Sequence, residues 1–269
     1  MPTPQLADQI IAASAFEDVF VPALFREWGP RLASAARVGP GDRVLDVACG
    51  TGVAARAAAE AAGPSGAVFG VDINPGMLAV AARVGPAVTW REAPAESLPF
   101  PDRSFDAVVS QFGLMFFADR EGALREMWRV LRPGGRLAVA VWASLEETPA
   151  YAIEADLIDR FGGPAAGEAI RTPFVLGDRD RLATLFADAG IPDAAVTTGQ
   201  GTGRFGSVRT MLEADLRGWL PNVGIRLEED VIETILRAGE LELARFVAAD
   251  GSVEFASPAH IVTATRAAG

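Results

Sequence analysis

The sequence predicts an α/β protein built on a doubly wound, mostly parallel sheet. Three observations predict this fold class: short β-branched runs alternate with helix-forming segments between residues 43 and 142, turns containing glycine separate them, and 50% of the 269 residues are hydrophobic. Strands that alternate with helices in this rhythm form a parallel sheet with helices on both faces. The length suits one such domain with insertions.

The N-terminal residues 1–40 are expected to form a helical cover, with helix near 6–36. A sheet core is expected over residues 41–143. Its predicted strands are short apolar runs bounded by turns, at 43–47, 67–71, 88–91, 105–110 and 136–142. Its predicted helices cover 53–62, 75–83 and 123–131, and in the last of these the apolar residues recur at spacings of three and four. Residues 133–135, Pro-Gly-Gly, are expected to form a tight turn before the last of these strands.

The strand–helix rhythm breaks after Trp142. Residues 144–269 are expected to hold the rest of the sheet, with one strand near 194–205 and a last strand near 253–265. Helical insertions near 145–178 and 207–248 are candidate lids, because mobile helical segments beside a sheet edge commonly enclose a substrate.

The composition excludes several kinds of site. The net charge of −11 and the pI near 4.7 disfavour a nucleic-acid or anionic-membrane partner. No lysine occurs anywhere, which rules out Schiff-base chemistry and a P-loop lysine. With a single cysteine, Cys49, and a single histidine, His260, we expect no disulfide and no Cys/His metal site. The N-terminal residues lack the pattern of a secretory signal and no apolar stretch is long enough to span a membrane, so the expected location is cytoplasmic.

A glycine-rich turn follows the first predicted strand and is compatible with two ligands. Gly50, Gly52 and Ala55 match G-x-G-x-x-A, and Asp72 ends the next strand, which is also the dinucleotide fingerprint. Asp46, however, lies within the first strand run. A carboxylate there suits a cationic sulfonium and ammonium better than a pyrophosphate, which a helix N-terminus would bind.

Four motifs in order separate the two interpretations, and their resemblance to a known family is specific. The runs are Val44–Gly52, Asp72, Leu98–Asp106 (LPFPDRSFD) and Arg129–Val139 (RVLRPGGRLAV). Over about residues 40–142 they resemble class I S-adenosylmethionine (SAM)-dependent methyltransferases, and in particular the small-molecule enzymes of the ubiquinone/menaquinone-biosynthesis type. The resemblance implies a Rossmann-like, seven-stranded sheet with an antiparallel last strand and an inserted helical lid, and SAM as cofactor.

The resemblance also implies which residues hold the cofactor. Those expected near its methionine part are Asp46, Cys49, Gly50 and Gln111. Those expected near its ribose and adenine are Asp72, Ile73, Ala95 and Glu96. Phe20 and Trp28, in the N-terminal cover, are also expected among the cofactor-binding residues. One departure concerns the adenine contact: relatives usually carry Asp-Ala-Glu before Leu-Pro-Phe, whereas this chain has Pro94, so Glu96, a backbone carbonyl or a water would have to accept from the adenine amino group.

The expected reaction is in-line transfer of a methyl group from SAM to an O, N or C atom of a small, partly apolar molecule. Because the activation resides in the cofactor, the protein mainly positions the reactants and excludes water. No catalytic base is therefore assigned; Tyr151 and His260 are weak candidates. A nicotinamide-dependent oxidoreductase and a SAM-binding protein without methyl transfer stay open as alternatives, and so does a homodimer.

Overall fold

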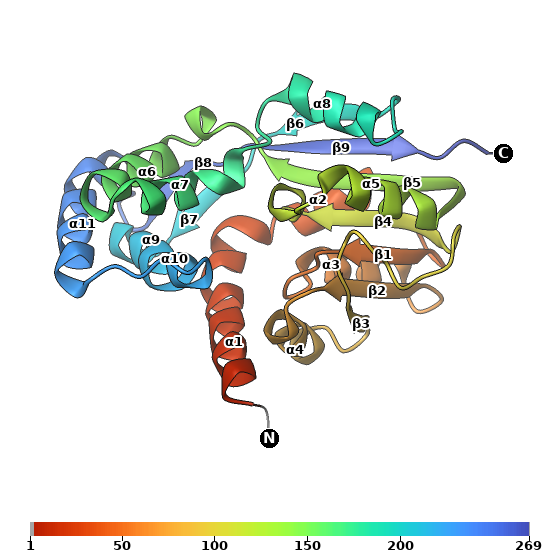
Figure 1. Ribbon diagram of the computed structural model, residues 1–269, viewed down its shortest axis with the longest axis horizontal. Helices are drawn as coiled ribbons and strands as arrows, with labels where there is room; N and C mark the ends of the chain where they lie inside the picture. Colours follow the sequence, from red (N-terminus) through yellow and green to blue (C-terminus); the bar gives the residue numbers. More distant parts are fainter. Residues whose placement is uncertain (1–2, 269) are drawn as a thin grey trace.

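The structure is a computed structural model that describes residues 3–268 (Figure 1). Its centre is a seven-stranded sheet of order β3-β2-β1-β4-β5-β9-β6. The strands are β1 Arg43–Val47, β2 Ala67–Asp72, β3 Thr89–Glu92, β4 Phe105–Gln111, β5 Leu131–Trp142, β6 Ala195–Gly199 and β9 Ala259–Thr265. The first five are parallel, and β9 is antiparallel to both β5 and β6. The predicted doubly wound sheet with an antiparallel last strand is confirmed.

The helices of the core are α2 Trp28–Ala35, α3 Val53–Ala62, α4 Pro75–Val84, α5 Arg120–Val130 and α8 Arg179–Asp188. The strand order reverses between β1 and β4, so right-handed crossovers place α3 and α5 on opposite faces of the sheet. The strands between these helices are mostly buried, as β4 and the second half of β5 show most clearly.

The expected turn at residues 133–135 is instead part of β5. The strand begins at Leu131, which pairs with Phe105, and its register with β4 shifts before Ala107. Gly134 has a φ of 76° and lies in this irregularity, which glycine tolerates without steric cost. The structure therefore extends the predicted strand by the five residues before Arg136.

The two predicted strands at 194–205 and 253–265 each divide into two. After β6 the chain forms β7 Thr202–Phe205, and before β9 it forms β8 Val253–Ala256; β7 and β8 pair in a separate two-stranded ribbon. The break coincides with Pro258, which has no N–H to donate, while Ser257 still donates to the Gly201 carbonyl at 2.9 Å. The ribbon leads from the sheet toward the lid.

A group of helices lies beside the carboxyl end of β5 (Figure 1). They are η3 Leu145–Glu147, α6 Pro149–Gly162, α7 Pro164–Arg171, η4 Thr172–Phe174, α9 Val208–Glu213, η5 Ala214–Trp219, α10 Leu220–Asn222, α11 Glu229–Glu242 and η6 Ala244–Phe246. The helix α6 packs against α7 and α11, and α9 packs against α11. We refer to residues 145–174 and 208–246 as the lid. None of the helices within residues 3–268 is long and apolar enough to cross a membrane.

The N-terminal segment is helical but not uniform. The helix α1 Pro4–Ala15 continues into η1 Phe16–Phe25, which is π-helical. Pro22 lies inside η1 and cannot donate a backbone hydrogen bond, which agrees with a local widening of the helix. In Figure 1 the segment runs between the lid and the sheet. It touches α4 closely, since a Cβ built on Gly76 would lie 2.5 Å from the backbone of Gln9.

Candidate functional site

The strand order reverses between β1 and β4, and the backbone is strained there. Ala48, directly after β1, has a φ of 54°, and Phe112, directly after β4, has a φ of 55°. Left-handed backbone is costly for both residue types and tends to be retained at functional sites. The two loops touch, because a Cβ on Gly113 would lie 2.6 Å from the Ala48 Cβ. In open α/β sheets this point is where ligands bind.

The glycine loop between β1 and α3 is shaped by packing as well as by conformation. Gly50 and Gly52 have φ values of 52° and 90°. A Cβ on Gly52 would lie 2.3 Å from the Trp90 ring, whereas the space beside Gly50 is open. Cys49, the residue before Gly50, is buried against Gly70 of β2, and burial raises the pKa of its thiol. The loop thus exposes backbone at Gly50 and packs tightly at Gly52.

Asp72, at the end of β2, fastens the glycine loop. One carboxylate oxygen accepts from the Gly50 N–H at 2.8 Å and the other from the Asn74 N–H at 2.9 Å. Burial raises the pKa of Asp72, and its backbone donors oppose that rise. Asn74, not Asp72, caps α4 by accepting from Gly76 and Met77. Ile73, adjacent to Asp72, is 69% exposed, so an apolar side chain lies open beside the carboxylate.

Several buried acceptors at this edge have no donor among the described residues. Asp46 is 1% exposed; one of its oxygens accepts from the Ala55 N–H at 2.9 Å, and the other has no partner. Gln111 Nε2 donates to the Phe25 carbonyl at 3.2 Å, and its Oε1 is buried without a partner. The hydroxyls of Thr51 and Ser110 are also buried without a hydrogen-bond partner among the described residues.

Burial raises the pKa of Asp46 to about 8, with smaller contributions from the Asp72 charge and, in the opposite direction, from Arg56. Buried polar groups are almost always hydrogen-bonded in native proteins, so orphaned acceptors point to a ligand that brings donors. The ammonium group of the SAM methionine moiety carries such donors and a positive charge. The residues present therefore fit this cofactor.

The N-terminal segment covers the same edge. Arg56 on α3 pairs with Glu17 on η1 at 2.9 Å. The Phe25 ring meets that of Phe112 at 5.5 Å. Phe20 is half-buried and packs on the Phe205 ring of the β7 strand at 6.3 Å. Trp28 lies deeper than Phe20: it is 0% exposed, in edge contact with Phe112 and Trp142, so it supports the cover from within.

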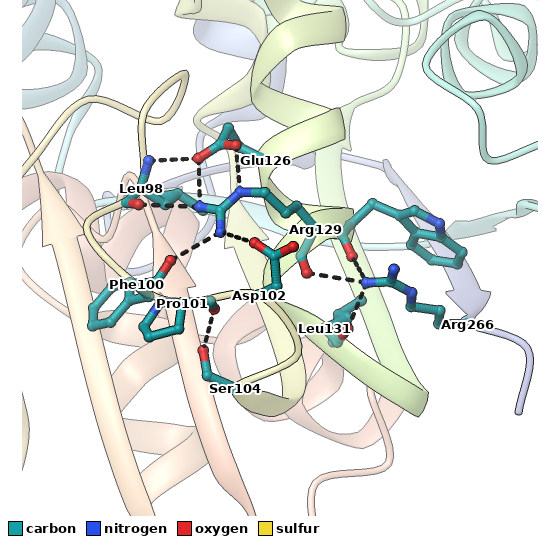
Figure 2. A network of polar contacts seen from close by, with 10 residues as sticks. Leu98, Phe100, Pro101, Asp102, Ser104, Glu126, Arg129, Leu131 and Arg266 are labelled. Carbon is teal, nitrogen blue, oxygen red and sulfur yellow. Dashed lines mark hydrogen bonds and ion pairs between the residues drawn. The ribbon is translucent and has the colours of Figure 1, made fainter. Parts of the chain in front are cut away.

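Ala95 and Glu96 stand at the start of the loop that holds LPFPDRSFD. Ala95 is buried and Glu96 is partly exposed. One arginine of the fourth motif fixes this loop: Arg129 donates to the carbonyls of Leu98 and Phe100 and pairs with Glu126 and Asp102, as Figure 2 shows.

Glu126 in turn accepts from the Leu98 N–H at 2.8 Å. Its hydrogen bond with Arg129 holds the pKa of the Glu126 carboxyl below its usual value. Arg266, just after β9, donates to the Trp128, Arg129 and Leu131 carbonyls. The LPFPDRSFD motif at Leu98–Asp106 and the RVLRPGGRLAV motif at Arg129–Val139 are therefore in direct contact. Their spacing in the sequence did not reveal this contact.

The two weak candidate bases lie in different surroundings. His260 is buried in β9; Nε2 donates to the Gly177 carbonyl at 2.9 Å and Nδ1 lies 2.9 Å from the Thr198 hydroxyl. Both ring nitrogens are occupied, so we leave His260 out of the proposed site. Tyr151, on α6, is 7% exposed and donates to Asp215 at 3.3 Å. Sequence reasoning missed Asp215, and also Glu154, three residues after Tyr151 on the same helix; that spacing was the available signal.

Comparison with known proteins identifies the family. Residues 45–139 match a protein-family model that is described as a methyltransferase domain. The chain is 36% identical over 190 residues to the ubiquinone/menaquinone biosynthesis C-methyltransferase UbiE of Burkholderia mallei, covering 65% of this chain and 77% of the relative. The Burkholderia vietnamiensis UbiE is 37% identical with the same coverage. The chain belongs to the UbiE-type SAM-dependent methyltransferases.

Membership in this family settles the ambiguity of the glycine motif. The chain is an enzyme that uses SAM, and the nicotinamide-dependent alternative is not supported. Solved structures agree on the fold. YcgJ of Bacillus subtilis superposes with a TM-score of 0.57 at 19% identity, over 90% of this chain and 100% of that chain. Phosphoethanolamine N-methyltransferase 2 of Haemonchus contortus gives 0.58 at 17%, over 95% of this chain and 56% of that chain.

Proposed function

We propose that this methyltransferase transfers the SAM methyl group to a small, partly apolar molecule enclosed between the N-terminal cover and the lid. The observation that carries the proposal is the pair of buried, unpartnered acceptors on neighbouring strands, Asp46 Oδ1 and Gln111 Oε1. They lie on β1 and β4, between which the strand order reverses, and Asp72 ends the neighbouring strand β2. Aromatic rings from three segments, Phe25, Phe112 and Trp142, surround this edge.

Each residue has a distinct part in this proposal. Asp46 and Gln111 accept hydrogen bonds from the ammonium group, and Asp72 accepts from the ribose hydroxyls while it holds Gly50. Ile73 and Ala95 flank the adenine, with Glu96 beside them. Bound SAM supplies an activated methyl group, so the chain must align the acceptor and exclude water. The aromatic contacts of the cover serve that exclusion.

The net charge of −11 favours a small acceptor over a nucleic acid. Because the relatives are described as C-methyltransferases, carbon is one of the acceptor atoms to test, along with oxygen and nitrogen. The single cysteine is free, which suits the reducing cytoplasm in which we place the reaction.

A calorimetric comparison tests the proposal. The protein is titrated with SAM, S-adenosylhomocysteine, NAD⁺ and NADP⁺, and we expect binding of the first two only. SAM labelled in the methyl group is then incubated with phenols, enols and amines of metabolite size, and transfer of label is measured. Binding of a nicotinamide cofactor without binding of SAM would sink the proposal.

A further inference from the structure

The lid buries three titratable side chains that the cofactor site does not use. Tyr151 and Glu154 lie on α6 and Asp215 lies on η5; they are 7%, 0% and 5% exposed. The Tyr151 hydroxyl donates to an Asp215 oxygen at 3.3 Å. The Glu154 carboxyl lies near enough to Asp215 for their charges to interact, and neither of its oxygens has a hydrogen-bond partner within residues 3–268. We call these three residues the lid carboxyl cluster.

The cluster has no cation to balance it. Among residues 3–268, no arginine forms an ion pair with Glu154 or Asp215, although other lid carboxylates such as Glu233 and Glu229 are paired. Two ionised carboxylates repel each other, so we expect at least one of the two to be protonated in the free protein. Burial raises the pKa of Asp215 to about 7 and that of Glu154 well above its usual value. When either carboxyl ionises, its buried charge requires a counter-charge, and residues 3–268 supply none in an ion pair with it.

Aromatic rings line the cluster. The rings of Phe174 and Phe255 each lie 5.7 Å from that of Tyr151. Phe255 stacks on Phe205 at 6.4 Å, and Phe205 meets Phe20 of the N-terminal cover. The aromatic surface is therefore continuous from the cluster to the cover of the cofactor edge.

The position of the cluster links it to that edge. The helix α6 begins at Pro149, soon after β5 ends at Trp142. The segment η4, which carries Phe174, packs against η2 Leu114–Phe116, the segment that follows β4. A molecule held by the cluster would thus lie beside the strand ends where the cofactor is proposed to bind.

Two further observations point to a ligand. Thr148, the residue before α6 and three residues before Tyr151, is 0% exposed and its hydroxyl has no partner among the described residues. Asp215 belongs to a π-helical segment, and such segments occur frequently at functional sites. That segment meets the other π-helical segment, η1, since a Cβ on Gly218 would lie 3.9 Å from the Phe20 ring.

We propose that the lid carboxyl cluster binds a protonated amino group of the methyl acceptor, whose remaining part is aromatic or otherwise apolar. This inference rests on the proposed function and names the class of its substrate. An ammonium group supplies the missing positive charge and up to three N–H donors for the oxygens of Glu154 and Asp215. Its attraction to aromatic faces suits the rings of Phe174 and Phe255. A hydroxyl would supply one donor and no charge, and a carboxylate would be repelled.

The test uses three matched probes on the protein saturated with S-adenosylhomocysteine. They are 2-phenylethylamine, the neutral 2-phenylethanol and the anionic 3-phenylpropanoate, and their binding is measured by calorimetry. We expect the amine to bind at least about tenfold more tightly than the alcohol, and the anion not to bind. Glu154→Gln and Asp215→Asn should each weaken amine binding by about 30-fold or more, as expected for loss of a buried charge partner.

A control variant and a second readout keep the test specific. Asp156→Asn changes an exposed carboxylate on the same helix and should leave amine binding unchanged. Affinity for S-adenosylhomocysteine and the melting temperature show whether each variant is folded, and Tyr151→Phe, which should weaken amine binding less, replaces any variant that is not. Equal binding of alcohol and amine, undiminished amine binding in both carboxyl variants, or no amine binding by a protein that binds S-adenosylhomocysteine would overturn the inference. Failure to bind S-adenosylhomocysteine would instead refute the proposed function itself.

Discussion

The edge of the sheet and the lid both bury carboxyl groups, but they satisfy them differently. At the edge, Asp46 and Asp72 accept hydrogen bonds from backbone N–H groups of Ala55, Gly50 and Asn74. In the lid, Asp215 accepts from the Tyr151 hydroxyl, and neither oxygen of Glu154 has a hydrogen-bond partner among the described residues.

The difference concerns what the fold itself provides. Backbone donors at the edge come from the glycine loop and the start of two helices, so any sequence that forms this fold positions them. They hold the carboxylates in place before a cofactor arrives. The lid offers no such donors, so protons or a ligand must compensate its carboxyls. The edge is therefore expected to be organised in the free protein, and the lid to depend on what it binds.

The largest expected effect lies at the edge. Asp72→Ala removes both the proposed contact to the ribose and the anchor of Gly50, so affinity for S-adenosylhomocysteine should fall by about 2–3 kcal/mol. Asp119→Ala is the control, because Asp119 is also a carboxylate that accepts a backbone N–H, at the start of α5. Calorimetry on both variants gives the comparison; equal affinities for the parent and Asp72→Ala would remove Asp72 from the site.

The next effect concerns the loop beside the adenine. Arg129→Ala leaves the Leu98 and Phe100 carbonyls without their side-chain donor, and Glu126 keeps only the Leu98 N–H. The free energy of unfolding should fall by about 2 kcal/mol, the range for charge-assisted hydrogen bonds. Arg125→Ala, one turn earlier on the exposed side of α5, should change it by less than about 0.5 kcal/mol. Urea unfolding measures both, and similar losses in the two variants would show that Arg129 does not clamp the loop.

A third effect links pH to cofactor affinity through Asp46, whose carboxyl faces Asp72 and Arg56. Since burial raises its pKa to about 8 in the free protein, the group is protonated at pH 6–7, and an ammonium ligand favours its ionised form. Binding should therefore release a proton, and affinity for S-adenosylhomocysteine should rise by up to about tenfold per pH unit toward pH 8. Calorimetry in buffers of different ionisation enthalpy detects the proton. Asp46→Asn should abolish its release; a variant that releases as many protons would contradict this role.

The smallest effect is in the lid. The folded-state pKa values of Glu154 and Asp215 are raised, so their contribution to stability is complete below about pH 4, the usual carboxyl pKa. This contribution to stability is lost as the pH rises through about 7, which is the pKa of Asp215 in the folded protein. Glu154→Gln removes one of the two carboxyls and should raise the free energy of unfolding at pH 8 by about 1 kcal/mol, with a smaller change at pH 5.

Urea unfolding at both pH values checks this prediction. Asp156→Asn should leave the pH dependence as it is in the parent protein. If Glu154→Gln shows the same pH dependence as the parent, the carboxyls of the lid are not uncompensated in the free protein.

The sheet core could be predicted from the sequence because its signals are local. The β-branched runs, the helix cap at Asn74 and the glycine turns lie within a few residues of the structures they specify. The strain at Ala48 and Phe112 could not be predicted, since it arises where two strands that are distant in the sequence meet. The predicted strand at 253–265 is divided into β8 and β9, and for this division Pro258 was a partial signal in the sequence.

The lid could be predicted only as helical. Tyr151 and Asp215 lie 64 residues apart, and nothing in either local pattern indicates that the two helices bring them together. Arg129 was included in a motif, yet its partners Leu98 and Phe100 are 31 and 29 residues away. Long-range packing decides these contacts, and a single sequence does not encode it in any local pattern.

The bond from Gln111 to the Phe25 carbonyl has a kinetic consequence. It joins the end of β4 to the N-terminal cover, and the Glu17–Arg56 ion pair joins the same cover to α3. If the cofactor binds at this edge as proposed, its release requires these two contacts to break, whereas the sheet itself need not move. The rate of product release is then expected to depend on the N-terminal cover, and salt, which screens the ion pair, should accelerate it.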